Sequence, residues 1–122
     1  MRGMREMEEE ICQSSQQDLG RSLFTNFLIE VTSIVSTAIH DANNLHKWMK
    51  DVLEDINLAL APGSAYTRYE PLGVVCVIGS WNVPWWTIFK PLVHGISAGN
   101  CVLLKPSEMA PHASACMKKF VD

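Results

Sequence analysis

The sequence is short of cysteine and of positive charge, and each shortage argues against a class of protein. Its four cysteines, spread over 122 residues, form no Cys-x-x-Cys pair, unlike a disulfide scaffold or a zinc ribbon. The formal net charge of -3 argues against the basic surface that nucleic-acid binding requires. We therefore expect reduced, buried thiols and no nucleic-acid partner.

The chain also lacks the usual marks of secretion and of membrane insertion. Its start, MRGMREMEEEICQSSQQD, mixes charges of both signs and has no apolar centre, unlike a secretory signal. The uncharged stretch from Pro71 to Phe89 is nearly long enough to span a bilayer. Asn82 and Pro84 in its middle would need hydrogen-bonding partners that a single span lacks. We expect an intracellular, cytoplasmic protein with no membrane segment.

What the chain does have is the composition of a single globular domain. It is 48% hydrophobic and 19% charged, and a chain of this length buries roughly two-thirds of its unfolded surface. The mixed charges of residues 1–15 predict a flexible amino terminus. The rest divides into two segments, 16–62 and 63–122, because the spacing of apolar residues changes between them.

Residues 16–62 have the spacing of amphipathic helices. From Gln16 to Ile39, apolar residues recur every three or four positions, which predicts one long helix with a single buried stripe. The sequence HDANN is expected to interrupt it. A second helix is then predicted to run to about Leu60, on the spacing of Leu45, Trp48, Met49, Val52 and Ile56.

Residues 63–122 predict a strand, a helix, a strand and a helix. GVVCVIGS and CVLLK are apolar runs typical of strands covered on both faces, and Ser107 is placed to cap the last helix. This order is that of a parallel α/β unit. Two such strands do not form an independent sheet. We expect amino-terminal helices followed by a partial parallel βαβα unit, which is either a piece of a larger fold or pairs with another chain.

Asn82 follows the first predicted strand, where α/β proteins place their ligands. Its amide could cap the following helix or donate to an oxyanion, and the residues alone favour the cap. The neighbouring tryptophans are interpreted as core or interface residues in preference to the wall of a ligand pocket.

Lys105 and Glu108 lie on either side of the turn after the second strand. They could bind the hydroxyl groups of a ribose, or Glu108 could simply favour the start of the helix that Ser107 caps. The residues alone do not favour either reading. The sequence contains no glycine-rich phosphate loop, and its histidines lack metal-ligand spacing, so no metal site is predicted.

The motifs YEPLGVVCVIGSWNVPWW and PLVHGISAGNCVLLKPSE, in this order, resemble the aldehyde dehydrogenase superfamily, and its class 3 branch in particular. The resemblance is dense from Tyr69 to Glu108 and weaker in the helices upstream. It implies an incomplete aldehyde dehydrogenase fold, in which 63–122 is part of a Rossmann-like domain that binds NAD or NADP.

The resemblance also implies roles for residues. Asn82 would be catalytic, donating its amide to the oxyanion formed when a cysteine thiolate attacks an aldehyde on its way to a carboxylic acid. Lys105 and Glu108 would contact the cofactor ribose. The stretch Ile78, Gly79, Ser80 and Trp81 would border the cofactor. A small-molecule aldehyde is the expected substrate, and a homo-oligomer is possible by the same resemblance.

The family's nucleophilic cysteine and general-base glutamate lie downstream of the KPSE motif, and neither surrounding motif occurs here. We therefore expect no dehydrogenase turnover from these residues alone. The alternative is a truncated, non-catalytic interaction module that docks on a full-length subunit, because exposed strand edges recruit partners.

Overall fold

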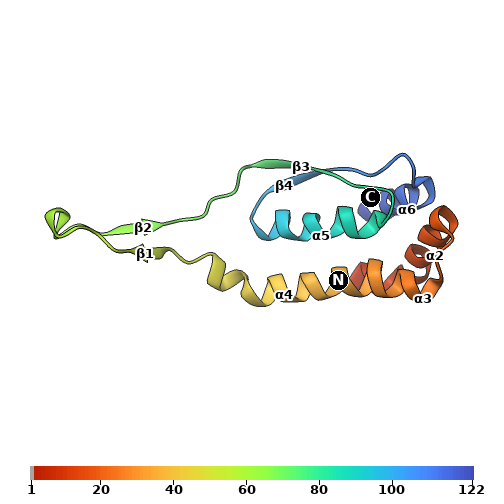
Figure 1. Ribbon diagram of the computed structural model, residues 1–122, viewed down its shortest axis with the longest axis horizontal. Coiled ribbons are helices and arrows are strands. Elements are labelled where there is room, and N and C mark those ends of the chain that lie inside the picture. Colours follow the sequence, from red (N-terminus) through yellow and green to blue (C-terminus); the bar gives the residue numbers. More distant parts are fainter. Residues whose placement is uncertain (1) are drawn as a thin grey trace.

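The computed structural model describes residues 2–122, which fold into three layers with one protruding arm (Figure 1). A long helix forms the first layer, α5 the second and a two-stranded sheet the third, while α2 and α6 pack together at one end. The helices are α1 Arg2–Glu6, α2 Glu8–Leu19, α3 Leu23–Asn26, η1 Phe27–Thr32, α4 Ser33–Trp48, η2 Leu58–Leu60, α5 Pro84–Ser97 and α6 Pro111–Val121, and the strands are β1 Val52–Glu54, β2 Ala65–Thr67, β3 Val74–Ile78 and β4 Cys101–Lys105.

The amino-terminal helices begin and end at places that the apolar spacing did not predict. Residues 2–15, predicted to be flexible, lie in α1 and α2, which bury Met4 and Ile11. The break falls at Gly20, whose φ of 67° ends α2, and not at HDANN, which lies inside α4. Ser22 then caps the next helix, since its hydroxyl accepts from Thr25 N at 3.1 Å.

From Leu23 to Trp48 the chain forms one continuous helix, in which η1 is a π-helical segment. By length and composition this helix could cross a membrane, but buried polar residues on it contact α5, as described below. The predicted stripe is buried only in part. Val31 and Ile34 are buried, whereas Phe24 is 69% exposed, and the buried positions include Asn26, Glu30 and Asp41.

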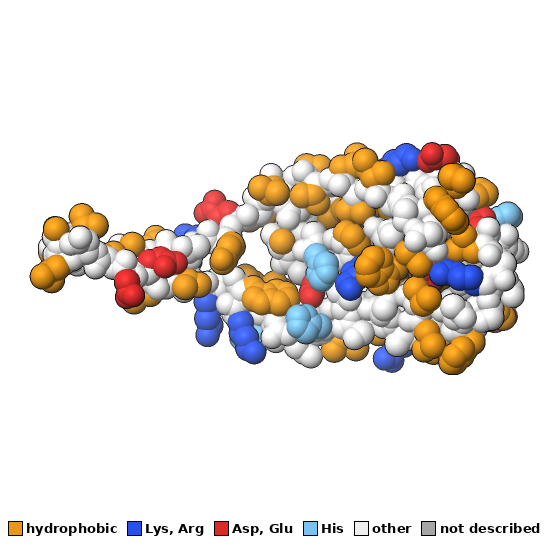
Figure 2. Space-filling model, viewed as in Figure 1, with side chains coloured by type: hydrophobic (Ala, Val, Ile, Leu, Met, Phe, Trp, Pro, Cys, Tyr) orange, Lys and Arg blue, Asp and Glu red, His pale blue; other side chains and the backbone are white. Residues whose placement is uncertain are grey.

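The prediction that a second helix runs to about Leu60 is wrong beyond Trp48, because β1 occupies Val52–Glu54. The strands β1 and β2 form an antiparallel hairpin that projects from the body as an arm (Figures 1 and 2). Leu53 pairs with Tyr66, and Arg68 donates two hydrogen bonds to Asp51 at the base of the arm. The helical spacing of apolar residues gave the wrong prediction here because β1 is stabilised by pairing with β2, and the spacing within β1 alone does not indicate that pairing. The predicted division at residue 63 stays a prediction.

The predicted parallel strands are confirmed: β3 pairs with β4 from Val74 with Cys101 to Ile78 with Lys105, and α5 connects them. The sheet is covered on one face only, so the prediction of two covered faces is wrong for this chain. Exposed and half-buried side chains alternate along both strands. The open face carries Val74, Cys76, Ile78, Cys101, Leu103 and Lys105.

The core lies between α5 and its neighbours. Trp85 is fully buried, as the core interpretation predicted, and its ring centroid lies 4.9 Å from that of Phe89. Phe120 of α6 packs edge-on against Phe89. Gly95 allows α5 to approach the sheet, because a Cβ there would lie 2.8 Å from Val102 Cγ2.

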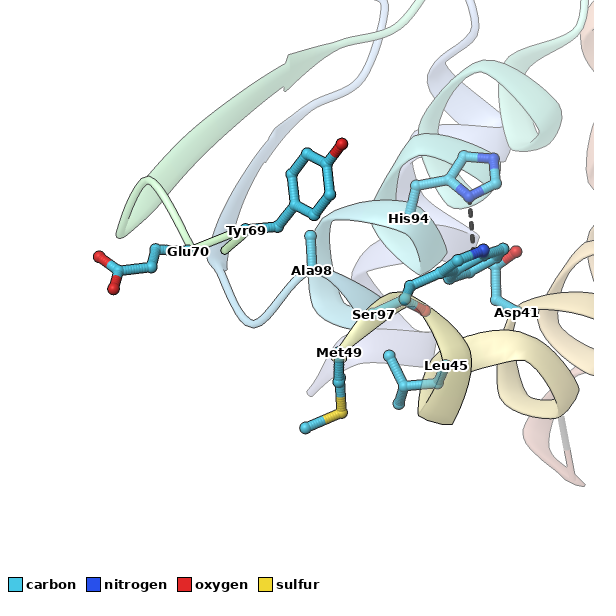
Figure 3. Close-up of a pocket in the computed structure, with 9 residues that line it drawn as sticks. Asp41, Leu45, Met49, Tyr69, Glu70, His94, Ser97 and Ala98 are labelled. Atoms are coloured by element: carbon cyan, nitrogen blue, oxygen red, sulfur yellow. Dashed lines mark hydrogen bonds and ion pairs between the residues drawn. The ribbon is translucent and has the colours of Figure 1, made fainter. Parts of the chain in front are cut away.

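Three buried carboxylates of the amino-terminal helices bind the later helices. The first, Asp41 of α4, lies toward the carboxyl end of α5, where its Oδ2 is 2.7 Å from His94 Nδ1 (Figure 3). Its other oxygen is 3.3 Å from His40 Nδ1. Burial opposes the charge on Asp41, but the hydrogen bonds from His94 and His40 outweigh it and lower its pKa.

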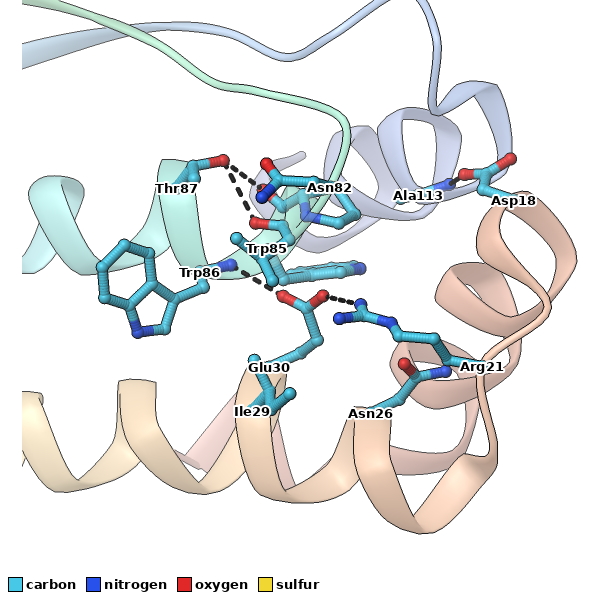
Figure 4. A network of polar contacts seen from close by, with 12 residues as sticks. Asp18, Arg21, Asn26, Ile29, Glu30, Asn82, Trp85, Trp86, Thr87 and Ala113 are labelled. Carbon is cyan, nitrogen blue, oxygen red and sulfur yellow. Dashed lines mark hydrogen bonds and ion pairs between the residues drawn. The ribbon is translucent and has the colours of Figure 1, made fainter.

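The second, Glu30 of η1, binds the amino end of α5 (Figure 4). Its Oε2 accepts from Trp86 N at 2.9 Å, and its Oε1 is ion-paired with Arg21. Glu30 is fully buried, and this desolvation raises its pKa despite the hydrogen bonds from Trp86 and Arg21, which act in the opposite direction.

The third, Asp18 of α2, caps α6. Its carboxylate accepts from His112 N at 3.1 Å and from Ala113 N at 2.8 Å, and its Oδ1 lies 2.7 Å from His112 Nδ1. The prediction that Ser107 caps this helix is therefore wrong. Ser107 accepts instead from Met109 N, within the turn before α6.

Substituting Asp18 by alanine is expected to destabilise the chain by about 1–2 kcal/mol, because it leaves two backbone donors of α6 without their cap. Urea unfolding followed by circular dichroism measures the change. The matched control is Glu10→Gln on the same helix, which is expected to change the stability far less because its ion pair with Lys119 is exposed to solvent. Equal losses for both variants would contradict the cap.

The buried Glu30 predicts a pH dependence of stability. A carboxyl group whose pKa is raised by folding binds its proton more readily in the folded state, so the free energy of unfolding rises as the pH falls toward the group's ordinary value. The unfolding free energy of the parent chain should therefore rise relative to that of Glu30→Gln as the pH falls. Glu9→Gln, at an exposed position, controls for the loss of one charge, and a difference that moves the other way would refute the burial argument.

Candidate functional site

The candidate site lies at the carboxyl ends of β3 and β4. Ile78 and Lys105 are register partners at these ends, and Gly79 N donates to Lys105 O at 3.0 Å. Gly79 lies where a side chain would not fit, since a Cβ would be 2.5 Å from Ile88 Cγ1 of α5. The close approach of α5 thus fixes the start of the turn that carries the next candidate residues.

Asn82 lies in this turn, exposed to solvent, and does not cap α5. Its carboxamide oxygen accepts from the Ser80 hydroxyl at 2.7 Å. The residue before α5 is Val83, which makes no side-chain cap, so the cap that the sequence favoured is wrong. Because the oxygen is held by Ser80, the amide nitrogen is the free end of the Asn82 side chain within residues 2–122 (Figure 4).

Thr87 holds the turn to the helix, and the sequence interpretation missed it. Its hydroxyl accepts from Ser80 N at 3.1 Å and lies 3.1 Å from Val83 O, to which it can donate. A threonine in the first turn of a helix that lacks a side-chain cap was the available signal, because such hydroxyls bond readily to nearby backbone.

Lys105 and Glu108 form an ion pair across the turn after β4. Lys105 Nζ lies 2.6 Å from Glu108 Oε2, and both side chains are exposed. The hydrogen bond from Lys105 lowers the pKa of Glu108, which keeps the carboxylate ionised as an acceptor. A donor and an acceptor side by side suit the two hydroxyl groups of a sugar.

A cavity of about 840 Å³ opens beside this pair, between the sheet, α5 and α6. Lys105, Ser107 and Glu108 are among its polar lining residues, and Phe89, Leu104 and Phe120 are among its apolar ones. This volume lies in the range of small-molecule sites. Asn82 does not line it, so the structure brings Ile78, Gly79, Lys105 and Glu108 together and leaves Asn82 beside Ser80 on the adjacent turn.

A smaller cavity of about 560 Å³ lies where α4 and α5 end (Figure 3). Asp41, Trp48, Tyr69 and His94 are among its lining residues. The Asp41 carboxylate is already bound to histidines, and the Glu70 side chain points away from the other labelled residues. The Asp41 carboxylate is therefore already satisfied within this cavity.

The four cysteines lie in two kinds of environment. Burial raises the pKa of Cys12 and of Cys116, which disfavours their thiolates. Cys76 and Cys101 lie on the open sheet face, so the expectation that Cys76 is buried in its strand is wrong. Within residues 2–122 the structure contains no group of three or more metal-ligating side chains.

The aldehyde dehydrogenase family model matches residues 1–122. Over 115 residues the chain is 36% identical to an aldehyde dehydrogenase of Craterostigma plantagineum, covering 94% of this chain and 24% of that protein. It is 38% identical over 105 residues to human aldehyde dehydrogenase family 3 member B1, covering 86% of this chain and 22% of that protein. The chain thus spans about a quarter of the length of these relatives.

Solved structures agree with the sequence relatives. The fold matches AldH of Staphylococcus aureus in a substrate-bound state with a TM-score of 0.94 and 28% identity, over 98% of this chain and 26% of that one. It also matches succinic semialdehyde dehydrogenase of Streptococcus pyogenes, in complex with NADP+, with a TM-score of 0.84 and 19% identity, over 97% of this chain and 25% of that one. The protein belongs to the aldehyde dehydrogenase family and has the fold of part of such an enzyme.

Proposed function

We propose that this chain supplies part of the active site of an NAD(P)-dependent aldehyde dehydrogenase, namely the oxyanion donor and the ribose contacts of the cofactor. The observation that carries the proposal is the exposed Asn82 side chain, whose oxygen is held by Ser80 while its N–H groups have no partner within residues 2–122. A hydrogen-bond donor fixed in advance stabilises a developing negative charge without having to reorganise during the reaction.

In the proposed mechanism a thiolate from outside these residues attacks the aldehyde carbon, and the carbonyl electrons move to oxygen. Asn82 Nδ2–H donates to that oxyanion. A bound NAD or NADP, held by Lys105 and Glu108, would supply the acceptor for the hydride that leaves the carbon. Water would then release the carboxylic acid from the resulting thioester and return the thiol. The thiolate is placed outside these residues because no described cysteine lines the cavity beside Lys105. Burial also raises the pKa of Cys12 and of Cys116, which disfavours their thiolates.

The cofactor is proposed to bind in the cavity beside Lys105 and Glu108. Lys105 would donate to one ribose hydroxyl and Glu108 would accept from another, after their ion pair opens. Ile78, Gly79, Ser80 and Trp81 would border the cofactor with their backbone. A carboxylate that accepts from the 2′-hydroxyl favours NAD, because it would repel a phosphate at the same position.

The role of Asn82 is tested in a hybrid enzyme, in which the matched residues of this chain replace the corresponding segment of the Craterostigma plantagineum aldehyde dehydrogenase. Asn82→Ala is expected to lower kcat by about 10²- to 10³-fold and to change KM far less. Formation of the reduced cofactor, followed by absorbance, measures the rate.

The matched control is Asn43→Ala, which removes an exposed amide from α4 and is expected to leave kcat unchanged. A hybrid that turns over equally fast with and without the Asn82 amide would falsify the oxyanion role. A folded hybrid that binds cofactor and turns over no aldehyde would also count against the proposal.

A second candidate is a non-catalytic module that docks on a full-length aldehyde dehydrogenase subunit. The open sheet face favours it, since Val74, Ile78 and Leu103 are all more than half exposed. Co-purification of the chain with the same full-length relative, followed by size-exclusion chromatography, is expected to give one complex. Leu103→Lys should abolish the complex. A chain that elutes as a stable monomer beside its unbound partner would rule the module out.

A further inference from the structure

We propose that Glu30 is a positioning residue for Asn82: its carboxylate accepts the Trp86 N–H and so fixes where α5 begins and how the preceding turn presents the Asn82 amide. This inference rests on the proposed role of Asn82. Glu30 touches neither Asn82 nor the cavity beside Lys105, so its effect would be transmitted through the backbone.

A π-helical segment places the Glu30 side chain against the amino end of α5. Glu30 and Val31 are both buried within the π-helical segment η1, which packs against α5. A π-helical turn is wider than an α-helical turn and shifts the face on which side chains emerge. Arg21, from the loop before the helix, pairs with the carboxylate, and the Cys12 thiol is a nearby titratable group that senses its charge.

No side chain next to α5 in the sequence accepts the Trp86 N–H in place of Glu30. The first amides of a helix have no partner within the helix, and the turn before α5 offers no cap, because Val83 is apolar and the Asn82 oxygen is taken by Ser80. The Trp86 amide instead bonds to a residue 56 positions earlier in the chain. The start of α5 therefore depends on the amino-terminal helix.

The position of the Trp86 amide is linked to Asn82 through the few residues between them. Trp86 is followed by Thr87, whose hydroxyl accepts from Ser80 N and lies within hydrogen-bond distance of Val83 O. These bonds close the turn on both sides of Asn82, while the Ser80 hydroxyl holds its carboxamide oxygen. A shift of the first turn of α5 must therefore move the Asn82 side chain as well.

The coupling is tested by nuclear magnetic resonance on the ¹⁵N-labelled chain over a pH series that begins near the ordinary pKa of a glutamate and extends upward, because burial raises the pKa of Glu30. The backbone amide of Trp86 and the side-chain amide of Asn82 are expected to shift with one common midpoint. In Glu30→Gln, which keeps an acceptor oxygen but cannot titrate, both shifts should be lost.

The control variant is Asp41→Asn, which removes the charge of a buried carboxylate that contacts the far end of α5. The common midpoint of Trp86 and Asn82 should stay in place in this variant. That result would show that a general loss of stability does not produce the coupling. An Asn82 amide that stays still while Trp86 titrates, or that titrates in Glu30→Gln, would overturn the proposal. A Trp86 amide that does not titrate would overturn it too.

A double-mutant cycle in the hybrid enzyme tests the consequence for catalysis. Glu30→Ala is expected to lower kcat on the order of 10- to 100-fold, as for a misplaced catalytic group, and Glu30→Gln to restore part of it. Against an Asn82→Ala background Glu30→Ala should cost nothing further in kcat, because its effect acts through that amide.

The two proposals fail in different ways. If Asn82→Ala alone leaves kcat unchanged, the oxyanion role fails. If Asn82→Ala lowers kcat and Glu30→Ala lowers it by the same factor in both backgrounds, Asn82 keeps its role and Glu30 is not its positioning residue.

Discussion

Carboxylates buried between layers hold this chain together, because they satisfy backbone donors that the later helices leave open. Asp18 binds two amides of α6, and Glu30 binds an amide of α5. A buried charge is tolerated only where it is paired and hydrogen-bonded, and Glu30 meets this condition through Arg21 and Trp86. The geometry of the turn before α5, and of everything that the turn carries, follows from these bonds.

The sheet, in contrast to the buried carboxylates, leaves part of its surface without a partner. Its strands are paired with each other, yet one face stays open and apolar, and the arm exposes Leu53 and Tyr66. Two strands do not bury enough surface to stand alone. The chain spans about a quarter of the length of the relatives it matches, and within residues 2–122 no layer covers this face.

The sequence predicted what depends on local chemistry and missed what depends on distant contacts. Both strands of the parallel pair, α5 with its buried Trp85 and the family were predictable from apolar runs and ordered motifs. The hairpin was not predicted, because the apolar spacing of its first strand was interpreted as helical. The cap of α6 was not predicted either, since Asp18 binds a residue far away in the chain. The candidate site was located by resemblance, whereas the support from Thr87 and Glu30 emerged only from the coordinates. The roles of Asn82, Lys105 and Glu108 stay predictions.

The bond between Asp18 and Ala113 joins residues 95 positions apart, which bears on how the chain reaches its native state. Contacts of such long range require large loops to close, and they slow folding relative to a bundle of local helices. During synthesis on the ribosome α2 emerges well before the helix it caps. Until α6 arrives, Asp18 lacks the two amides that it binds in the folded chain, and the apolar surface that α6 covers stays exposed, which makes the nascent polypeptide prone to aggregate.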